Sequence, residues 1–206
     1  MTYRKAVAVA LLAASLVGCQ PAPTPTTSGP SVVATGPDIE PTYECTPEFA
    51  APSPSPSVRP TTCSRAVYDQ MEARDAQYAE AERIYRELND LDVRAQRGEK
   101  IPDRDLDALV SKGLASRVRS DYRKAAGEQR LLRGGDVRIV WLRRLDDRAP
   151  DSALALSACI DGSSATLMQK GRAVGKGGVI IRDLSFGQEA GTLKAVDARF
   201  ETVQAC

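Results

Sequence analysis

Proline is distributed unevenly along this chain, and the distribution limits where a fold can form. Eleven of the 13 prolines lie between Pro21 and Pro60, mixed with Thr, Ser, Ala and Gly. Proline removes backbone donors and favours extended conformations, and this stretch has too little aliphatic surface to offset the entropy of ordering. We therefore expect a disordered linker over residues 19–62 and one domain with a single core over residues 63–206. A bare spacer is the simpler interpretation of the linker, and an acceptor of O-linked sugar is the alternative.

The segment before the linker has the order of a secretory signal. Two basic residues precede an apolar run over 6–18, which is shorter than the roughly 20 residues that a membrane-spanning helix needs. The run ends in LVGC at residues 16–19, which resembles the bacterial lipobox. That resemblance implies a signal peptide over 1–18, cleavage before Cys19, and a palmitate-type lipid on Cys19, because only a thiol can carry the thioether-linked diacylglycerol. We expect a protein held to the extracytoplasmic face of the cell membrane; an ordinary signal peptide with a chance cysteine is the alternative.

Cysteine, histidine and charge restrict the chemistry of the domain. The chain has no histidine and a formal net charge of +1, and it lacks any Cys-x-x-Cys pair, so we expect no metal, no cofactor and no nucleic-acid partner. Beyond Cys19, four cysteines outside the cytoplasm suggest two disulfides, for which three connectivities exist. We expect Cys45 to pair with Cys63, closing the proline-rich loop. We expect Cys159 to pair with Cys206, tying the end of the chain to a strand.

Helical periodicity in the first part of the domain gives way to strand alternation in the second. Apolar residues at spacings of three, four and seven predict a long helix over 64–97, with Val67, Met71, Tyr78, Ala81, Tyr85 and Leu88 on its apolar side. Two further helical segments are predicted over 102–110 and 114–132. Strands are predicted over 136–144, 152–160, 165–169, 179–186 and 192–206, with a glycine-rich connection after residue 169. This order predicts an α+β fold, with three helices packed on an antiparallel sheet.

The layout resembles a known family. A long first helix, two shorter ones and then antiparallel strands are similar to the NTF2-like (SnoaL-like, cystatin-like) fold, with its curved sheet. The sequence ACID at residues 158–161 and the cysteine at 206 resemble lipoproteins of actinobacteria that carry this fold. The sequence departs from that pattern at 191–193, where Gly-Thr-Leu replaces Gly-x-Trp. Most members have no assigned activity, so the resemblance implies a fold and a compartment.

The resemblance also suggests where a site would lie. Enzymes of the family place a carboxylate, often with Tyr or His, in the cone between helix and sheet. By chemistry alone the candidates are Asp121, Tyr122, Asp161 and Asp183, but none matches a ketosteroid isomerase or dehydratase site, and Asp161 is better explained by an Asp-Gly turn. We therefore expect no enzyme activity. The candidates for lining a cone-shaped pocket are Tyr78, Tyr85, Trp141 and Phe200, for which core packing is the simpler interpretation.

Three other patterns imitate functional motifs. The sequence GRAVGKGG at 171–178 lacks the hydroxyl residue that a phosphate loop needs, so we expect a hairpin. Acidic residues at 103, 105 and 107 lack the glycine and glutamate of a calcium loop, so we expect Asp103 to cap a helix. Basic residues over 117–133 predict a solvated helix face, with a membrane-surface helix as the alternative.

Two functional hypotheses remain. The first is a non-catalytic interaction or scaffold module at the cell envelope, bound to an envelope protein or to wall components. The second is a small-molecule binding protein that uses the cone. A binder should have an apolar cavity with a polar group at its base, whereas a scaffold should have a filled cone and an exposed apolar patch.

Overall fold

The structure is a computed structural model that describes residues 42–45, 61–145 and 153–206. The predicted signal peptide, Cys19 and most of the predicted linker lie outside the described residues. The described residues form three α-helices and nine β-strands, in agreement with the predicted α+β class. None of these helices is both long and apolar enough to cross a membrane.

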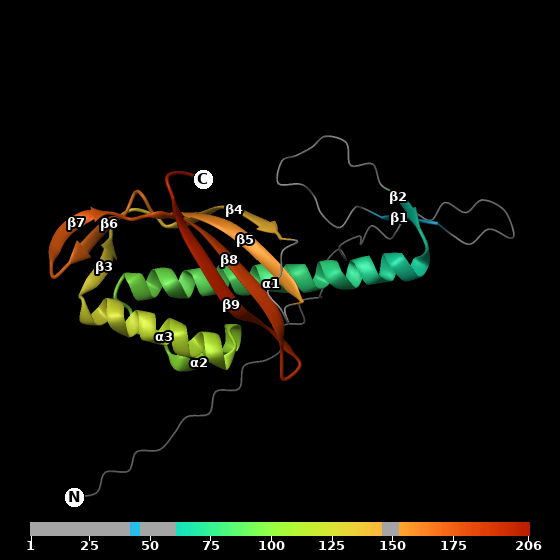
Figure 1. Cartoon of the computed structure of the whole chain (residues 1–206), viewed down its shortest axis with the longest axis horizontal. Helices are drawn as coiled ribbons and strands as arrows, with labels where there is room; N and C mark the ends of the chain where they lie inside the picture. The colour runs from blue at the N-terminus through green and yellow to red at the C-terminus, as the bar shows by residue number, and fades with distance from the viewer. Residues whose placement is uncertain (1–41, 46–60, 146–152) are drawn as a thin grey trace, which may run out of the picture. The chain divides into compact units, whose positions relative to one another are not determined.

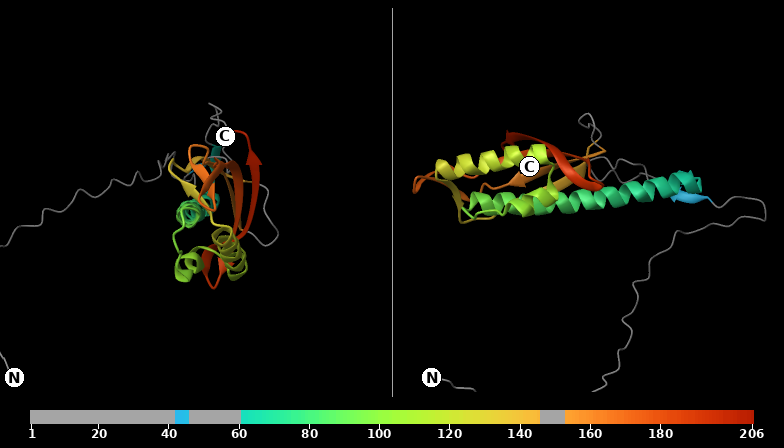
Figure 2. Two further views of the ribbon diagram at one scale, coloured as in Figure 1. Left: turned by 90° about the vertical axis from the view of Figure 1, so that its left-hand side faces the viewer. Right: turned by 90° about the horizontal axis from the view of Figure 1, so that it is seen from below.

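Helix α1 (Arg65–Gln96) confirms the predicted long helix and dominates the fold. Its 32 residues extend about 48 Å at 1.5 Å per residue. Burial begins at Tyr78 and continues through Leu91, whereas Val67 near the start is 50% exposed. The first part of α1 therefore runs beyond the large sheet toward β1 and β2 (Figures 1 and 2). Gly98, with φ of 92°, follows the helix end, a conformation that suits glycine just after a helix.

Helices α2 (Asp103–Leu109) and α3 (Lys112–Gly127) confirm the two shorter helices, with one correction. Ser111 caps α3, because its side chain accepts a hydrogen bond from the backbone N–H of Leu114 at 3.4 Å. The predicted helix over 114–132 is wrong at its end, where Arg130–Arg133 forms strand β3. Gln129, with φ of 51°, turns the chain out of the helix, and β6 then supplies the backbone partners of β3.

The large sheet consists of β4 (Arg138–Arg144), β5 (Leu154–Asp161), β8 (Val179–Glu189) and β9 (Thr192–Val203). Its order is β4-β5-β8-β9, and every pair is antiparallel. One face packs on the three helices, and its buried side chains include Leu156, Leu184 and Ala195. We call this the inner face and the opposite one the outer face.

A small sheet lies at the C-terminal ends of α1 and α3 (Figure 1). It contains β3, β6 (Thr166–Gln169) and β7 (Arg172–Lys176) in the order β3-β6-β7. The hairpin predicted for the GRAVGKGG segment is confirmed, because Lys170 and Gly171 turn the chain with φ of 49° and 76°. Strand β7 was not predicted, because the glycines after residue 169 suggested an irregular connection. Its backbone pairs with β6 and so forms a strand.

Both disulfides join the predicted partners. Cys45 in β1 (Tyr43–Cys45) is bonded to Cys63 in β2 (Thr61–Cys63), with Cα atoms 6.0 Å apart. Cys159 in β5 is bonded to Cys206, with Cα atoms 5.7 Å apart. The hairpin of β1 and β2 was not predicted; it lies at the start of α1, where the Tyr43 and Tyr68 rings stack at 5.1 Å.

Candidate functional site

A buried arginine on the inner face of the large sheet defines the candidate functional site. Arg182 occupies an inward-facing position of β8, and the inward-facing residues on either side of it along the strand are Ile180 and Leu184. It is only 8% exposed. An uncompensated charge in such a place would cost several kcal/mol, so its partners decide what the site can do. Those partners come from α1, and a tyrosine of α3 completes the group. We call the five residues the interior polar cluster: Arg182, Asp92, Tyr85, Asn89 and Tyr122.

Each nitrogen of the Arg182 guanidinium has a partner on α1. One Nη donates to the carboxylate of Asp92 in a salt bridge, and the other donates to Oδ1 of Asn89 at 3.3 Å. Its Nε donates to the hydroxyl of Tyr85 at 3.2 Å, while the guanidinium carbon lies 4.8 Å from the centre of that ring. The Tyr85 hydroxyl donates in turn to the Arg182 carbonyl at 2.8 Å. The second oxygen of Asp92 accepts the hydroxyl of Tyr122 from α3.

Burial and neighbouring charge keep these groups in one protonation state. Burial raises the pKa of Tyr122, and the negative charge of Asp92 raises it further. Burial likewise raises the pKa of Tyr85. For Arg182 burial opposes the charged form, but the charges and hydrogen bonds of Asp92 and Tyr85 together outweigh it, and the pKa lies above its ordinary value. At neutral pH both tyrosines are therefore protonated donors and the arginine is charged, which suits a structural bridge between α1, α3 and β8.

The four aromatic residues proposed to line a pocket do not come together. Tyr78 and Tyr85 are fully buried in the core between α1 and the sheet. Trp141 lies on the outer face, because it is paired with Cys159, one position from the inward-facing Ala158. Ile139 pairs with Ile160 and Trp141 pairs with Cys159, so the residue between them in β4 is an extra residue, a β-bulge. This extra residue turns the Trp141 side chain to the outer face. A pocket shared by all four residues is therefore wrong.

Phe200 is also misplaced by the pocket prediction. It pairs with Arg182 and so belongs to the inner face, but it is 76% exposed. Strand β9 is the edge of the sheet, and its burial ends before Phe200, after the stretch that contacts the helices. Aromatic character alone could not indicate that the helices stop short of this residue.

The acidic candidates separate in the fold. Asp121 is exposed on α3, and Asp183 lies on the outer face, so neither joins Tyr122 in the interior polar cluster. The structure confirms that Asp161 belongs to an Asp-Gly turn. Its carboxylate accepts hydrogen bonds from the backbone N–H and the hydroxyl of Ser163, at 2.9 and 2.6 Å. The Ser163 hydroxyl holds the pKa of Asp161 below its usual range.

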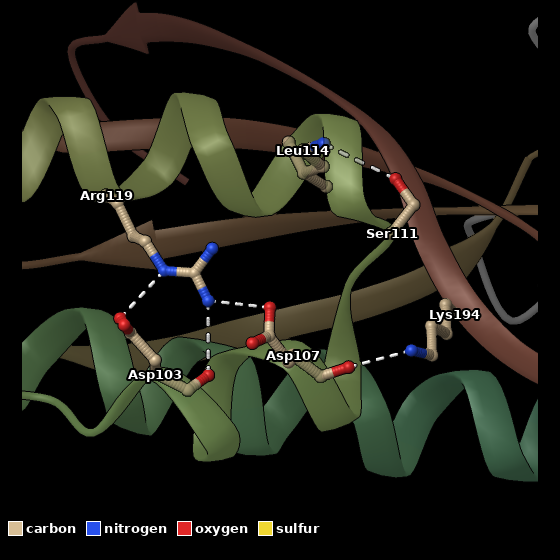
Figure 3. A network of polar contacts seen from close by, with 6 residues as sticks. All are labelled: Asp103, Asp107, Ser111, Leu114, Arg119 and Lys194. Atoms are coloured by element: carbon tan, nitrogen blue, oxygen red, sulfur yellow. Dashed lines mark hydrogen bonds and ion pairs between the residues drawn. The ribbon is translucent and has the colours of Figure 1, made fainter.

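Two of the three acidic residues on α2 bind an arginine of the protein itself (Figure 3). Arg119 of α3 donates to the carboxylates of Asp103 and Asp107 at 2.8 and 2.6 Å. The Lys194 ammonium of β9 donates to the Asp107 carbonyl at 2.8 Å. The prediction that Asp103 caps α2 is wrong, because Pro102 holds the cap position and Asp103 is the first helical residue. Its carboxylate reaches Arg119 instead, so Asp103 and Asp107 together join α2 to α3.

Sequence reasoning missed most of the interior polar cluster. It identified Tyr122 and Tyr85, but not Asp92, Asn89 or Arg182. An available signal was Arg182 itself, a charged residue at an inward position of β8, whose neighbouring inward positions Ile180 and Leu184 are apolar. No protein-family model and no curated protein matches this chain.

Proposed function

We propose that this protein is a membrane-anchored extracytoplasmic lipoprotein whose folded part is a non-catalytic interaction or scaffold module at the cell envelope. The observation that carries the proposal is the interior polar cluster. Arg182 binds Asp92, Asn89 and Tyr85 rather than presenting its charge to a ligand. The surrounding core contains large, fully buried side chains such as Tyr78 and Phe186. A filled interior supports a scaffold. The proposal includes that the domain has an NTF2-like fold similar to that of actinobacterial lipoproteins.

The oxidised cysteines support the compartment. Disulfides persist outside the cytoplasm and are rare within it, and the four cysteines of the described residues form two of them. This supports export through the segment at residues 1–18 and leaves Cys19 as the thiol for lipid attachment.

One observation favours the alternative, a small-molecule binding protein. The hydroxyl of Tyr78 is buried and has no hydrogen-bond partner among the described residues. A buried polar atom of this kind costs roughly 1–3 kcal/mol when unpaired, and a bound molecule could satisfy it. The same Tyr78 ring packs against the Arg144 guanidinium, whose central carbon is 4.2 Å from the ring centre.

The anchor is tested by metabolic labelling with a palmitate analogue. We expect the wild-type chain to be labelled and cleaved before Cys19, and the Cys19→Ala variant to remain unlabelled and unprocessed. The control is Cys159→Ser, which removes a different cysteine and should leave labelling unchanged. Labelling that persists in Cys19→Ala would exclude the anchor.

Native mass spectrometry distinguishes the scaffold from the binder. We expect the protein purified from its membrane to have the mass of its lipidated chain alone. A co-purifying small molecule that is lost from a Tyr78→Phe variant would establish the alternative instead, because that substitution removes only the unpaired hydroxyl.

A further inference from the structure

The basic side chains of α3 and of the small sheet differ in whether an acidic side chain neutralises them. Arg117 and Arg119 of α3 are neutralised, the first by Asp197 at 2.8 Å and the second by the acids of α2. Six others gather at the C-terminal end of α3 and on the small sheet, where all are exposed and none forms an ion pair with another described residue. We call these six the basic lobe: Arg123, Lys124, Arg133, Lys170, Arg172 and Lys176.

The β6–β7 hairpin gives the basic lobe its most accessible part. Every residue of β7 is exposed, and β7 is an edge strand of the small sheet. The chain from 163 to 181 contains no acidic residue, so the three cations of the hairpin have no neutralising neighbour in this stretch. Between Arg172 and Lys176, Val174 forms a bulge and is 54% exposed. The lobe thus combines unpaired cations with an exposed apolar side chain.

We propose that the basic lobe binds the anionic lipid headgroups of the membrane in which the chain is anchored. Anionic headgroups attract Lys and Arg at about 1 kcal/mol per charge. An exposed Val174 among these cations suits an interface with acyl chains below the headgroups, whereas a soluble polyanion requires no apolar contact. The proposal rests on the proposed anchor at Cys19.

The geometry allows the lobe and the anchor to reach one membrane. The hairpin of β1 and β2 lies at the start of α1 and the basic lobe at its end (Figure 1), about 48 Å apart by helix rise. The chain between Cys19 and Tyr43 can span up to about 75 Å when extended at about 3.1 Å per residue. The lobe can therefore touch the membrane while the lipid stays inserted, and contact would hold the domain against the surface.

The test measures vesicle binding by the chain from residue 20 onward, which keeps every described residue but lacks the signal segment and the lipid. Vesicles of phosphatidylcholine alone are compared with vesicles containing one third phosphatidylglycerol. We expect binding to the anionic vesicles only. Arg172→Glu/Lys176→Glu should weaken it at least about 25-fold, because each of the two lost charges near the surface changes binding about fivefold. Val174→Ser should weaken it to a lesser degree.

The matched control is Arg65→Glu/Arg104→Glu, which reverses the same number of exposed basic residues elsewhere and should change binding less than twofold. Circular dichroism confirms that each variant is folded. Equal binding to both vesicle types, or equal loss in the control, would overturn the proposal. Tighter binding to soluble polyphosphate, with no effect of Val174→Ser, would also overturn it and assign the lobe to an anionic polymer. The anchor is tested separately by Cys19 labelling, so either proposal can fail alone.

Discussion

Gly177 shows at the residue scale how packing can require a glycine of the GRAVGKGG segment. A Cβ built on Gly177 would lie 2.2 Å from the carbonyl oxygen of Gly162. The two backbone segments are fastened there, because the Gly162 N–H donates to the Gly178 carbonyl and the Gly177 N–H to the Ala165 carbonyl, both at 2.9 Å. The glycine is required by close backbone approach between two connections, and phosphate binding is not needed to explain it.

We predict that Gly177→Ala lowers the free energy of unfolding by about 2 kcal/mol or more, since a backbone oxygen cannot move aside as a side chain can. The matched control is Gly178→Ala in the same connection, where a Cβ has open space and the change should be within about 0.5 kcal/mol. Urea unfolding of both variants measures the difference. Equal stabilities would show that the connection is not packed as described.

Between elements, the interior polar cluster fastens the helices to the sheet. Arg182 brings β8 to α1, and Tyr122 adds α3 through the shared carboxylate of Asp92. On the edge strand, the connection between α2 and α3 covers part of β9, where Ser111 donates its backbone N–H to the Ala195 carbonyl at 2.9 Å. Edge strands left bare invite pairing with other chains, so this connection protects β9 as well as positioning α3.

For this cluster we predict strong coupling between Arg182 and Asp92. Arg182→Met and Asp92→Leu should each lower the free energy of unfolding by about 3–5 kcal/mol, because each leaves one charge buried without its partner. The double variant should lose clearly less than the sum of the two single losses. Denaturant unfolding of the four proteins gives the coupling energy, and strictly additive losses would contradict a direct buried pair. Tyr122→Phe, which removes one hydrogen bond, should cost about 1 kcal/mol.

For the whole molecule, the two disulfides secure different parts of the fold. The bond between Cys159 and Cys206 closes a loop of 47 residues around the sheet, and it holds the end of β9 to the outer face of β5. The bond between Cys45 and Cys63 spans 18 residues and holds the small hairpin at the start of α1, away from the main core. Cross-linking a longer loop removes more entropy from the unfolded chain.

Cys159→Ser/Cys206→Ser should therefore fold but lose about 2–4 kcal/mol of unfolding free energy, with β9 exchanging its amide hydrogens first. Cys45→Ser/Cys63→Ser is the comparison, and there we expect faster exchange in β1 and β2 with little change in the main transition. Hydrogen exchange with peptide resolution reports both effects. Peptide mapping without reduction should recover the two pairs, and a free thiol at Cys159 would contradict the structure.

Local pattern was sufficient for much of this fold. The 3.6-residue periodicity of α1 identified Tyr78, Ala81, Tyr85 and Leu88 as buried, and strict alternation placed Leu156 in the core. Helical periodicity and strand alternation both report which residues of a single element face inward. This can be read from neighbouring residues in the sequence. The pairing of the cysteines followed from their few connectivities and their places along the chain.

Other features depended on contacts between distant segments. Residues 130–133 continue a helical pattern but form β3, because β6 is available to pair with them. A single bulge in β4 moved Trp141 to the outer face, and the end of helix coverage left Phe200 exposed. The sequence by itself determined which residues each element could bury. Tertiary structure alone decided which partner each strand meets, because such contacts join segments that are not neighbours in the sequence: β3 pairs with β6, and Arg182 is buried beside Asp92, 90 residues away.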